Sequence, residues 1–147
     1  MTCLPVSARA ATATTSFAVN MTVQATCSIT SLPLGFGTYT GKVIDATTTI
    51  TITCTRTTGY NVGLSAGNGT GATVTNRLMT GGGVTLQYGL FSTADRSVNW
   101  GLTVPTDTVA GVGNGAAQVL TVYGRVAAGL FVPPGSYNDI ITATVTY

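Results

Sequence analysis

Apolar and polar residues alternate with a period of two along most of the chain. Residues 47–55 read TTTITITCT, which places Ile50, Ile52 and Cys54 on one face and threonines on the other. Successive side chains point to opposite faces in an extended strand. The β-branched residues Thr, Val and Ile also favour strands over helices. The pattern therefore predicts an all-β protein, and no segment has the periodicity of a convincing helix.

Three further segments show the same alternation. Their apolar positions are Tyr60, Val62, Leu64 and Ala66; Val84, Leu86, Tyr88 and Leu90; and Leu120, Val122, Gly124 and Val126. Turn signals rich in Gly or Pro separate them, at 67–69, 81–83, 111–115 and 133–135. Short strands without intervening helices are typical of an immunoglobulin-like antiparallel sandwich. The 147 residues are enough for one such domain with a single core.

Composition narrows the function classes. The chain is only 7% charged, with 30 Thr, no Glu and no His. Without His it lacks the commonest general base and most zinc and copper ligand sets. Its four Asp residues are too scattered for a paired-carboxylate site, so we expect no enzyme, no cofactor and no metal. Asp95 is more simply explained as the ion-pair partner of the adjacent Arg96.

The charge balance favours neither of two partner classes. The net charge of +2 comes from five Arg and one Lys spread over the chain, which does not favour nucleic acid or an anionic membrane surface. No apolar run is long enough to span a membrane. So few charges are unusual for a soluble monomer, and they are a first indication of a protein that assembles.

The pairing of the cysteines depends on the amino terminus. Residues 1–10 end in Ala-Arg-Ala, which fits a signal peptidase site, so we interpret them as the remnant of a signal peptide or, alternatively, as a disordered tail. Removing this segment with Cys3 leaves Cys27 and Cys54, each at the end of an apolar strand face. We predict a disulfide between them, which implies an oxidising compartment. The alternative is two unpaired, buried thiols.

The two end segments do not fit a complete sandwich. Residues 12–27 alternate over their whole length, beyond the usual strand of about 5 to 6 residues. The last segment alternates too, with Ile141, Ala143, Val145 and Tyr147 on one face, and no further strand follows to cover that edge. We therefore expect a fold that is one strand short at its end, with one strand to spare at its start.

Two arrangements would satisfy this pattern. The first segment of one copy could complete the sheet of the next copy by strand addition. Such a contact is heterologous and does not close, so repetition gives a filament. Alternatively, the segment could fold back as the first strand of its own domain and cover its own edge. The pattern alone does not decide between the two.

Several motifs follow one another in a characteristic order. They are the alternating residues 13–27, LGFGTY at 34–39, ITITC at 50–54, LQYGLF at 86–91, DRSVNWG at 95–101, TVYGR at 121–125, PGSYND at 134–139 and TVTY at 144–147. Together they resemble the spore coat protein U family, whose members include the pilins of archaic, Csu-like chaperone-usher pili. The resemblance covers residues 12–147, and the loop AAGL at 127–130 departs from it in detail.

The resemblance implies an incomplete immunoglobulin-like sandwich that lacks its last strand and is completed by the N-terminal donor strand of another subunit. Residues 11–24 would be the donor-strand extension and residues 25–147 the pilin domain. The donor side chains would be Ala13, Thr15, Phe17, Val19, Met21 and Val23. The groove that accepts them would include Ile141, Ala143, Val145 and Tyr147.

The resemblance also implies partners and a location. The partners would be identical or related pilin subunits, a periplasmic chaperone that lends the missing strand, and an outer-membrane usher. The chain would pass through the periplasm of a Gram-negative bacterium and become a structural subunit of an extracellular adhesive or biofilm fibre. Two alternatives stay open: a secreted, self-complemented coat protein, and a carbohydrate-binding adhesive module. Trp100, Tyr88 and Tyr123 could form a sugar-stacking platform for the latter, although aromatic residues on sandwich strands more often belong to the core.

Overall fold

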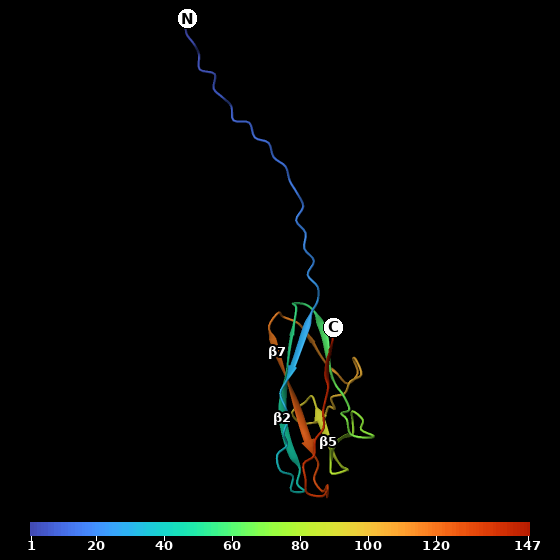
Figure 1. The fold of residues 1–147 in the computed structure, drawn as a ribbon. Coiled ribbons are helices and arrows are strands. Elements are labelled where there is room, and N and C mark those ends of the chain that lie inside the picture. The colour runs from blue at the N-terminus through green and yellow to red at the C-terminus, as the bar shows by residue number, and fades with distance from the viewer.

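The computed structural model describes residues 1–147 and has two parts (Figure 1). Residues 1–26 form an extended, exposed segment that leads away from the rest of the chain. Residues from 27 onward form a β-sandwich, and no helix is present that is long and apolar enough to cross a membrane. The predicted all-β class is thus confirmed. The strands are β1 (Cys27–Ser31), β2 (Ile44–Cys54), β3 (Gly59–Leu64), β4 (Arg77–Gly81), β5 (Val84–Phe91), β6 (Val109–Val112), β7 (Ala117–Val126) and β8 (Ala143–Thr146).

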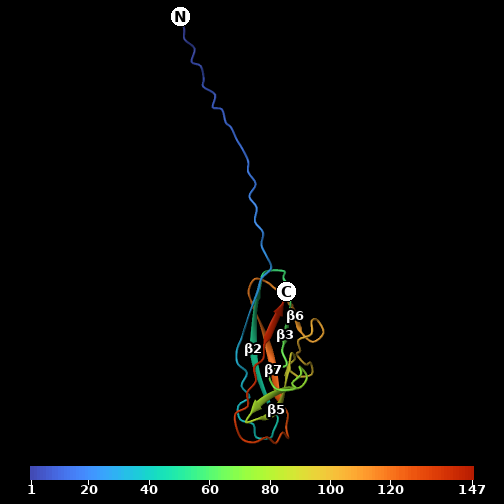
Figure 2. The same ribbon diagram turned by 45° about the vertical axis from the view of Figure 1, so that its right-hand side comes forward.

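The strands form two antiparallel sheets (Figure 2). One sheet has the strand order β1-β2-β7-β5-β4, and the other has the order β6-β3-β8. The long pairing of β2 with β7 places Ile50 opposite Leu120, both packed in the core, and Thr49 opposite Thr121 on the outer face. The alternation seen in the sequence therefore sets the register, because a slip of one residue would turn every apolar side chain to solvent.

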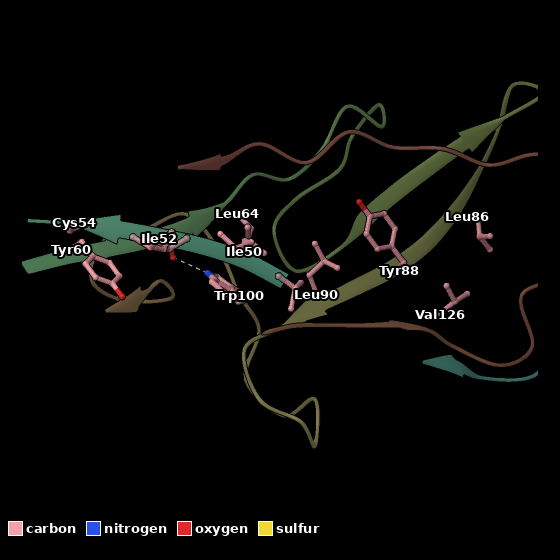
Figure 3. Close-up of a cluster of buried hydrophobic side chains, with 12 residues drawn as sticks. Ile50, Ile52, Cys54, Tyr60, Leu64, Leu86, Tyr88, Leu90, Trp100 and Val126 are labelled. Atoms are coloured by element: carbon pink, nitrogen blue, oxygen red, sulfur yellow. Dashed lines mark hydrogen bonds between the residues drawn. The ribbon is translucent and has the colours of Figure 1, made fainter. Parts of the chain in front are cut away.

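The core lies between the two sheets (Figure 3). Trp100 reaches it from the connection between β5 and β6, and its indole Nε1–H donates a hydrogen bond of 2.8 Å to the main-chain oxygen of Val62. Each fully buried apolar side chain contributes about 1.5 to 3 kcal/mol. The buried apolar residues are Ile50, Ile52, Cys54, Tyr60, Val62, Leu64, Leu86, Tyr88, Leu90, Trp100, Val122 and Val126.

A disulfide joins the first residue of β1 to the last residue of β2. It links Cys27 to Cys54, as predicted, and Cys3 remains a free thiol on the exposed segment. The two bonded cysteines are 27 residues apart in the sequence. Closing a loop of that length stabilises the fold by about 3 to 4 kcal/mol through its effect on the unfolded chain.

Arg77, at the start of β4, is completely buried, which no pattern in the sequence predicts. Its guanidinium donates hydrogen bonds of 2.6 to 3.0 Å to four main-chain oxygens, those of Leu64, Ser65, Val74 and Trp100. Burial lowers the pKa of Arg77, because desolvation disfavours the charged form. The side chain ties the irregular connections on either side of the β4-β5 hairpin to the end of β3.

The predicted ion pair between Asp95 and Arg96 is wrong. Asp95 instead accepts hydrogen bonds from the amide and hydroxyl of Ser97 within a turn. Arg96 turns away and pairs with Asp45 at 3.3 Å, and Arg125 donates to the same carboxylate at 2.7 Å. The hydrogen bond from Arg125 lowers the pKa of Asp45. Adjacent residues in a turn point in different directions, so neighbours in sequence need not form a pair.

Candidate functional site

On one side of the sandwich β1 and β8 lie near each other without pairing, and we call this unpaired seam the opening. β1 pairs only with β2, and β8 pairs only with β3. In an antiparallel strand the main-chain groups of successive residues point alternately toward one flanking strand and toward the other. The main chain of Thr142 bonds toward the β3 side, and the main chain of Leu32 bonds toward β2. The main-chain groups of Ala143 and Val145 therefore point toward the opening from one edge, and those of Ile29 point toward it from the other.

An apolar cavity of about 410 Å³ lies at one end of this opening, at Ser31 and Ala143. One wall is formed by residues 31–36, which continue from β1, and the other by residues 138–143, which lead into β8. Core residues form its floor, among them Ile50, Tyr88 and Leu90. A second cavity of about 520 Å³ shares Leu34 and Phe36 with the first and continues between residues 36–39 and 132–137. We refer to the opening and both cavities as the edge groove.

The four residues predicted for the groove lie in different positions. Ile141 and Ala143 line the first cavity. Val145, on β8, is half-buried and packs against the core. Tyr147 lies beyond the end of β8, is 58% exposed and lines neither cavity. Their role in accepting a strand remains a prediction.

The predicted donor segment lies outside the sandwich. Phe17, Val19, Met21 and Val23 are between 74% and 87% exposed. Ala13 and Thr15 are also exposed, and the segment does not fold back over its own groove (Figure 1). A row of exposed, large apolar side chains on one face of an extended segment marks an interaction surface. The segment leaves the sandwich at the end where β8 also terminates.

One polar interaction crosses the edge groove. Tyr88, on the floor, donates its Oη–H to Oδ2 of Asp139, on the wall, at 2.6 Å. Oδ1 of Asp139 accepts the amides of Asn68 at 2.7 Å and Ile140 at 2.8 Å. Burial, and then the bond to Asp139, raise the pKa of Tyr88. The alternation predicted a buried Tyr88, whose hydroxyl needs a partner, but nothing in the sequence identified Asp139 as that partner.

The aromatic residues considered for sugar stacking do not form an exposed platform. Trp100 and Tyr88 are 1% and 6% exposed and belong to the core. Tyr123 is half-buried on β7, with the guanidinium of Arg96 5.7 Å from the centre of its ring. The expectation that aromatic residues on sandwich strands belong to the core holds for Tyr88, whereas Trp100 reaches the core from a connection.

The fold was compared with solved structures. The chain aligns with a chain of the CsuC-CsuE chaperone-tip adhesion subunit pre-assembly complex, from the archaic chaperone-usher Csu pili of Acinetobacter baumannii, with a TM-score of 0.66 and 20% identity. The match covers 86% of this chain and 41% of that chain, so the chain spans less than half the length of its structural neighbour. The Escherichia coli Hda pilus minor tip subunit HdaB aligns with a TM-score of 0.37 and 18% identity, over 82% of this chain and 79% of that one.

Comparison of sequences identifies the family of the chain. The family model for the Spore Coat Protein U domain matches residues 13–144. Protein U of Myxococcus xanthus is 34% identical over 158 aligned residues, which cover 95% of this chain and 88% of that protein. The family that the motifs indicated is therefore confirmed. With an incomplete immunoglobulin-like sandwich and a family match over nearly its whole length, the chain belongs to the Spore Coat Protein U domain family.

Proposed function

We propose that the chain is a structural pilin subunit that polymerises into an extracellular fibre by donor-strand complementation. Residues 11–24 of one copy would fill the edge groove of the next copy. The observation that carries this proposal is the pairing of two features in one chain, an apolar groove between two unpaired strand edges and an exposed apolar segment that occupies no groove of its own.

The lengths of the two features agree. Residues 13–23 span ten residue steps, or about 34 Å at about 3.4 Å per residue in an extended strand. The wall of the groove from Cys27 to Phe36 spans nine steps, or at most about 32 Å. One donor segment would therefore extend along the whole groove, over both cavities.

The chemistry of the two features also agrees. The donor main chain would supply hydrogen-bonding partners to the unpaired edges of β1 and β8, as in other cases of strand addition. Its apolar face would bury Phe17, Val19, Met21 and Val23, each contributing about 1.5 to 3 kcal/mol. Thr15 and Ala13 would extend the row. The sum is large enough to make dissociation of the strand very slow.

The positions of the chain ends favour one direction for the donor strand. The extension leaves the sandwich at the pole where β8 ends, which we call the proximal pole, and the opposite end is the distal pole (Figure 1). A donor antiparallel to β8 would enter at the proximal pole and leave at the distal pole. Each copy would then donate from one pole and connect onward at the other, which gives an open fibre. A parallel donor would emerge beside the acceptor's own extension, where two domains would crowd each other.

The open groove needs protection before assembly, because an uncovered apolar strand edge is a template for aggregation. A periplasmic chaperone would lend a temporary strand, and an outer-membrane usher would exchange it for the donor segment of the incoming copy. Export fits the disulfide between Cys27 and Cys54, since such bonds form in oxidising compartments. Residues 1–10 would be the remnant of the export signal. In this account the protein has a structural role and no catalytic one.

The test compares two substitutions on opposite faces of the same segment. Phe17→Asp places a charge in the apolar row, whereas Ala18→Asp places it on the outward face. Fibres sheared from cells are analysed on a denaturing gel with and without boiling, because strand-complemented contacts resist detergent but not heat. We expect a heat-labile ladder of multimers from wild type and Ala18→Asp, and monomer alone from Phe17→Asp.

Two results would overturn the proposal. A normal ladder from Phe17→Asp would show that the apolar row is not the donor. A single band from folded, disulfide-bonded wild type in both lanes would favour the self-complemented coat protein instead.

A further inference from the structure

The apolar row of the donor segment does not by itself distinguish the groove of another copy from the groove of its own domain. If the segment turned back at residues 24–26, it would run antiparallel to β1, and Val23 would lie opposite Cys27. The next inward-facing pair would be Met21 and Ile29. Both Cys27 and Ile29 pack against the core, and residues directly opposite each other in an antiparallel pair have their side chains on the same face. The row would therefore face the core of its own domain as well as that of a neighbour.

A groove in the same chain has a large advantage over a groove in another copy. A short flexible connection gives an intramolecular site an effective concentration in the millimolar range, which falls to near zero where the connection cannot make the required path. Only Gln24, Ala25 and Thr26 connect Val23 to Cys27. The choice between self-complementation and a fibre therefore depends on the backbone that these three residues can adopt. This inference rests on the proposed function.

The last of the three residues is fixed to its own domain in an extended form. The main-chain oxygen of Thr26 accepts the amide of Thr55 at 3.0 Å, and its amide donates to Oγ1 of Thr55 at 3.2 Å. Oγ1 of Thr55 also shares a hydrogen bond of 2.6 Å with Oγ1 of Thr58. The disulfide between Cys27 and Cys54 fixes the next pair of residues. Thr26 has a negative φ, and the segment before it leads away from the sandwich (Figure 1).

A return into the groove of the same domain requires a different backbone. A hairpin with three loop residues between Val23 and Cys27 consists of a type I turn followed by a residue with φ > 0. That residue would be Thr26, and a positive φ is strongly disfavoured for a β-branched side chain. The two preceding positions would be Gln24 and Ala25, which are not among the residue types that favour turns. The hairpin would also take the main chain of Thr26 away from both of its hydrogen bonds.

We propose that Thr26 and Thr55 are positioning residues that select the groove of another copy over the groove of the same chain. Thr26, held in an extended form, directs the donor segment outward, where only another copy is within reach. In its own groove the segment would lie parallel to β8, opposite in direction to a donor from another copy. The selection therefore resides in the residues that precede Cys27, and a turn placed there should remove it.

The first test introduces a hairpin turn at this point. The turn variant carries Gln24→Pro, Ala25→Asp and Thr26→Gly, because Pro-Asp-Gly is a turn sequence with Gly at the position of positive φ. The matched control carries Gln24→Pro and Ala25→Asp and keeps Thr26. Sheared and periplasmic fractions are analysed on a denaturing gel with and without boiling. Native samples are also treated with chymotrypsin, whose cleavage after Phe17 reports whether the segment is covered.

We expect the turn variant to give monomer alone in the unboiled lane. Its peptide bond after Phe17 should resist chymotrypsin, because the segment fills its own groove. The matched control should keep the heat-labile ladder of the wild-type protein. A monomer that had merely failed to fold or to assemble would be cleaved after Phe17, so protection distinguishes self-complementation from damage.

The second test removes the acceptor on Thr55. Thr55→Val deletes Oγ1 and keeps the shape of the side chain, so the amide of Thr26 loses its partner. We expect the ratio of protected monomer to ladder to rise about two- to tenfold, the equilibrium factor of one hydrogen bond. Thr53→Val, two residues earlier on the same face of β2, is the control and should leave the ratio unchanged. Equal ratios in the two variants would overturn the role of Thr55.

Three other results would decide against the inference. A wild-type ladder from the turn variant would overturn it and leave the proposed function standing. A monomer of the turn variant that is cleaved after Phe17 would do the same, because its groove would then be empty. A wild-type protein that gives no ladder and only protected monomer would overturn both the selection and the proposed function.

Discussion

Tyr88 and Asp139 form a hydrogen bond of 2.6 Å that joins the floor of the edge groove to one of its walls. The wall segment around Asp139 belongs to no named strand, and the two residues are 51 positions apart in the sequence. A second tie holds the same segment, because Asn138 and Thr80 exchange main-chain hydrogen bonds. The width of the groove therefore depends on these polar contacts as well as on the sheets.

Removal of the Tyr88 hydroxyl should weaken the wall. A hydrogen bond to a charged group contributes about 1.5 to 3 kcal/mol to the free energy of unfolding. Because Asp139 is partly exposed, we expect Tyr88→Phe to lower the free energy of unfolding by an amount at the lower end of this range. Denaturant unfolding of the full chain measures the change. Tyr123→Phe is the matched control, since Tyr123 is half-buried and its hydroxyl takes part in none of the side-chain hydrogen bonds described above. Equal losses in the two variants would argue against a role for the bond.

The same tyrosine should make the fold sensitive to alkali. The folded-state pKa of Tyr88 is raised by burial and by Asp139, above its unfolded value of about 10. Its contribution to stability is therefore complete below about pH 10 and is lost as the pH rises toward the folded-state pKa. We expect the unfolding midpoint of wild type to fall more steeply above about pH 10 than that of Tyr88→Phe. If the unfolding midpoints of wild type and Tyr88→Phe fell equally steeply with pH, this prediction would be contradicted.

Arg77 should not tolerate replacement by lysine. A single ammonium group cannot reproduce the rigid fork that bonds to four carbonyl oxygens. Disrupting a buried, charged network costs about 3 to 5 kcal/mol, so Arg77→Lys should lower the unfolding free energy by roughly that amount. Arg125→Lys changes an exposed ion pair and should have little effect. An unfolding midpoint of Arg77→Lys equal to that of the wild-type protein would contradict the structural role of this residue.

Filling the edge groove should block acceptance of a strand and leave donation intact. Ala143 lines the first cavity, and a phenylalanine side chain in its place would occupy the space that the proposed donor strand fills. Ala143→Phe alone should form no ladder, whereas mixed with wild type it should shorten the fibres by adding to an end that no further copy can join. Thr144→Phe, on the outward face of β8, serves as the control. Fibres of normal length from Ala143→Phe mixtures would argue against the groove as the site.

Local pattern predicted most of the sandwich. Alternation identified the residues that β2, β3, β5 and β7 turn toward the core, and the cysteine positions identified the disulfide. Alternation also predicted a strand for residues 12–27, but in the structure only Cys27 of this range belongs to a strand. A strand needs a neighbouring edge to pair with, and this segment pairs with no edge of its own chain.

Other features depend on contacts that no local pattern contains. Arg77 occurs in a segment with no alternation, and its four partners come from three separate parts of the chain. Asp139 gains its role only because the fold brings it to Tyr88. Leu34 and Phe36 belong to a sequence motif, but nothing in that motif indicates that they form the wall of a groove. Such sites become visible only when distant segments are assembled.

The central claim is that the donor segment of one copy occupies the edge groove of another. The most direct measurement replaces Phe17 by the photoreactive p-benzoylphenylalanine in fibres mixed from chains with light and heavy nitrogen, and maps the cross-linked peptides by mass spectrometry. The account predicts mixed-isotope peptides that join position 17 to residues 31–36 or 138–143 of another copy. Cross-links confined to one copy, or to surfaces outside the groove, would contradict it.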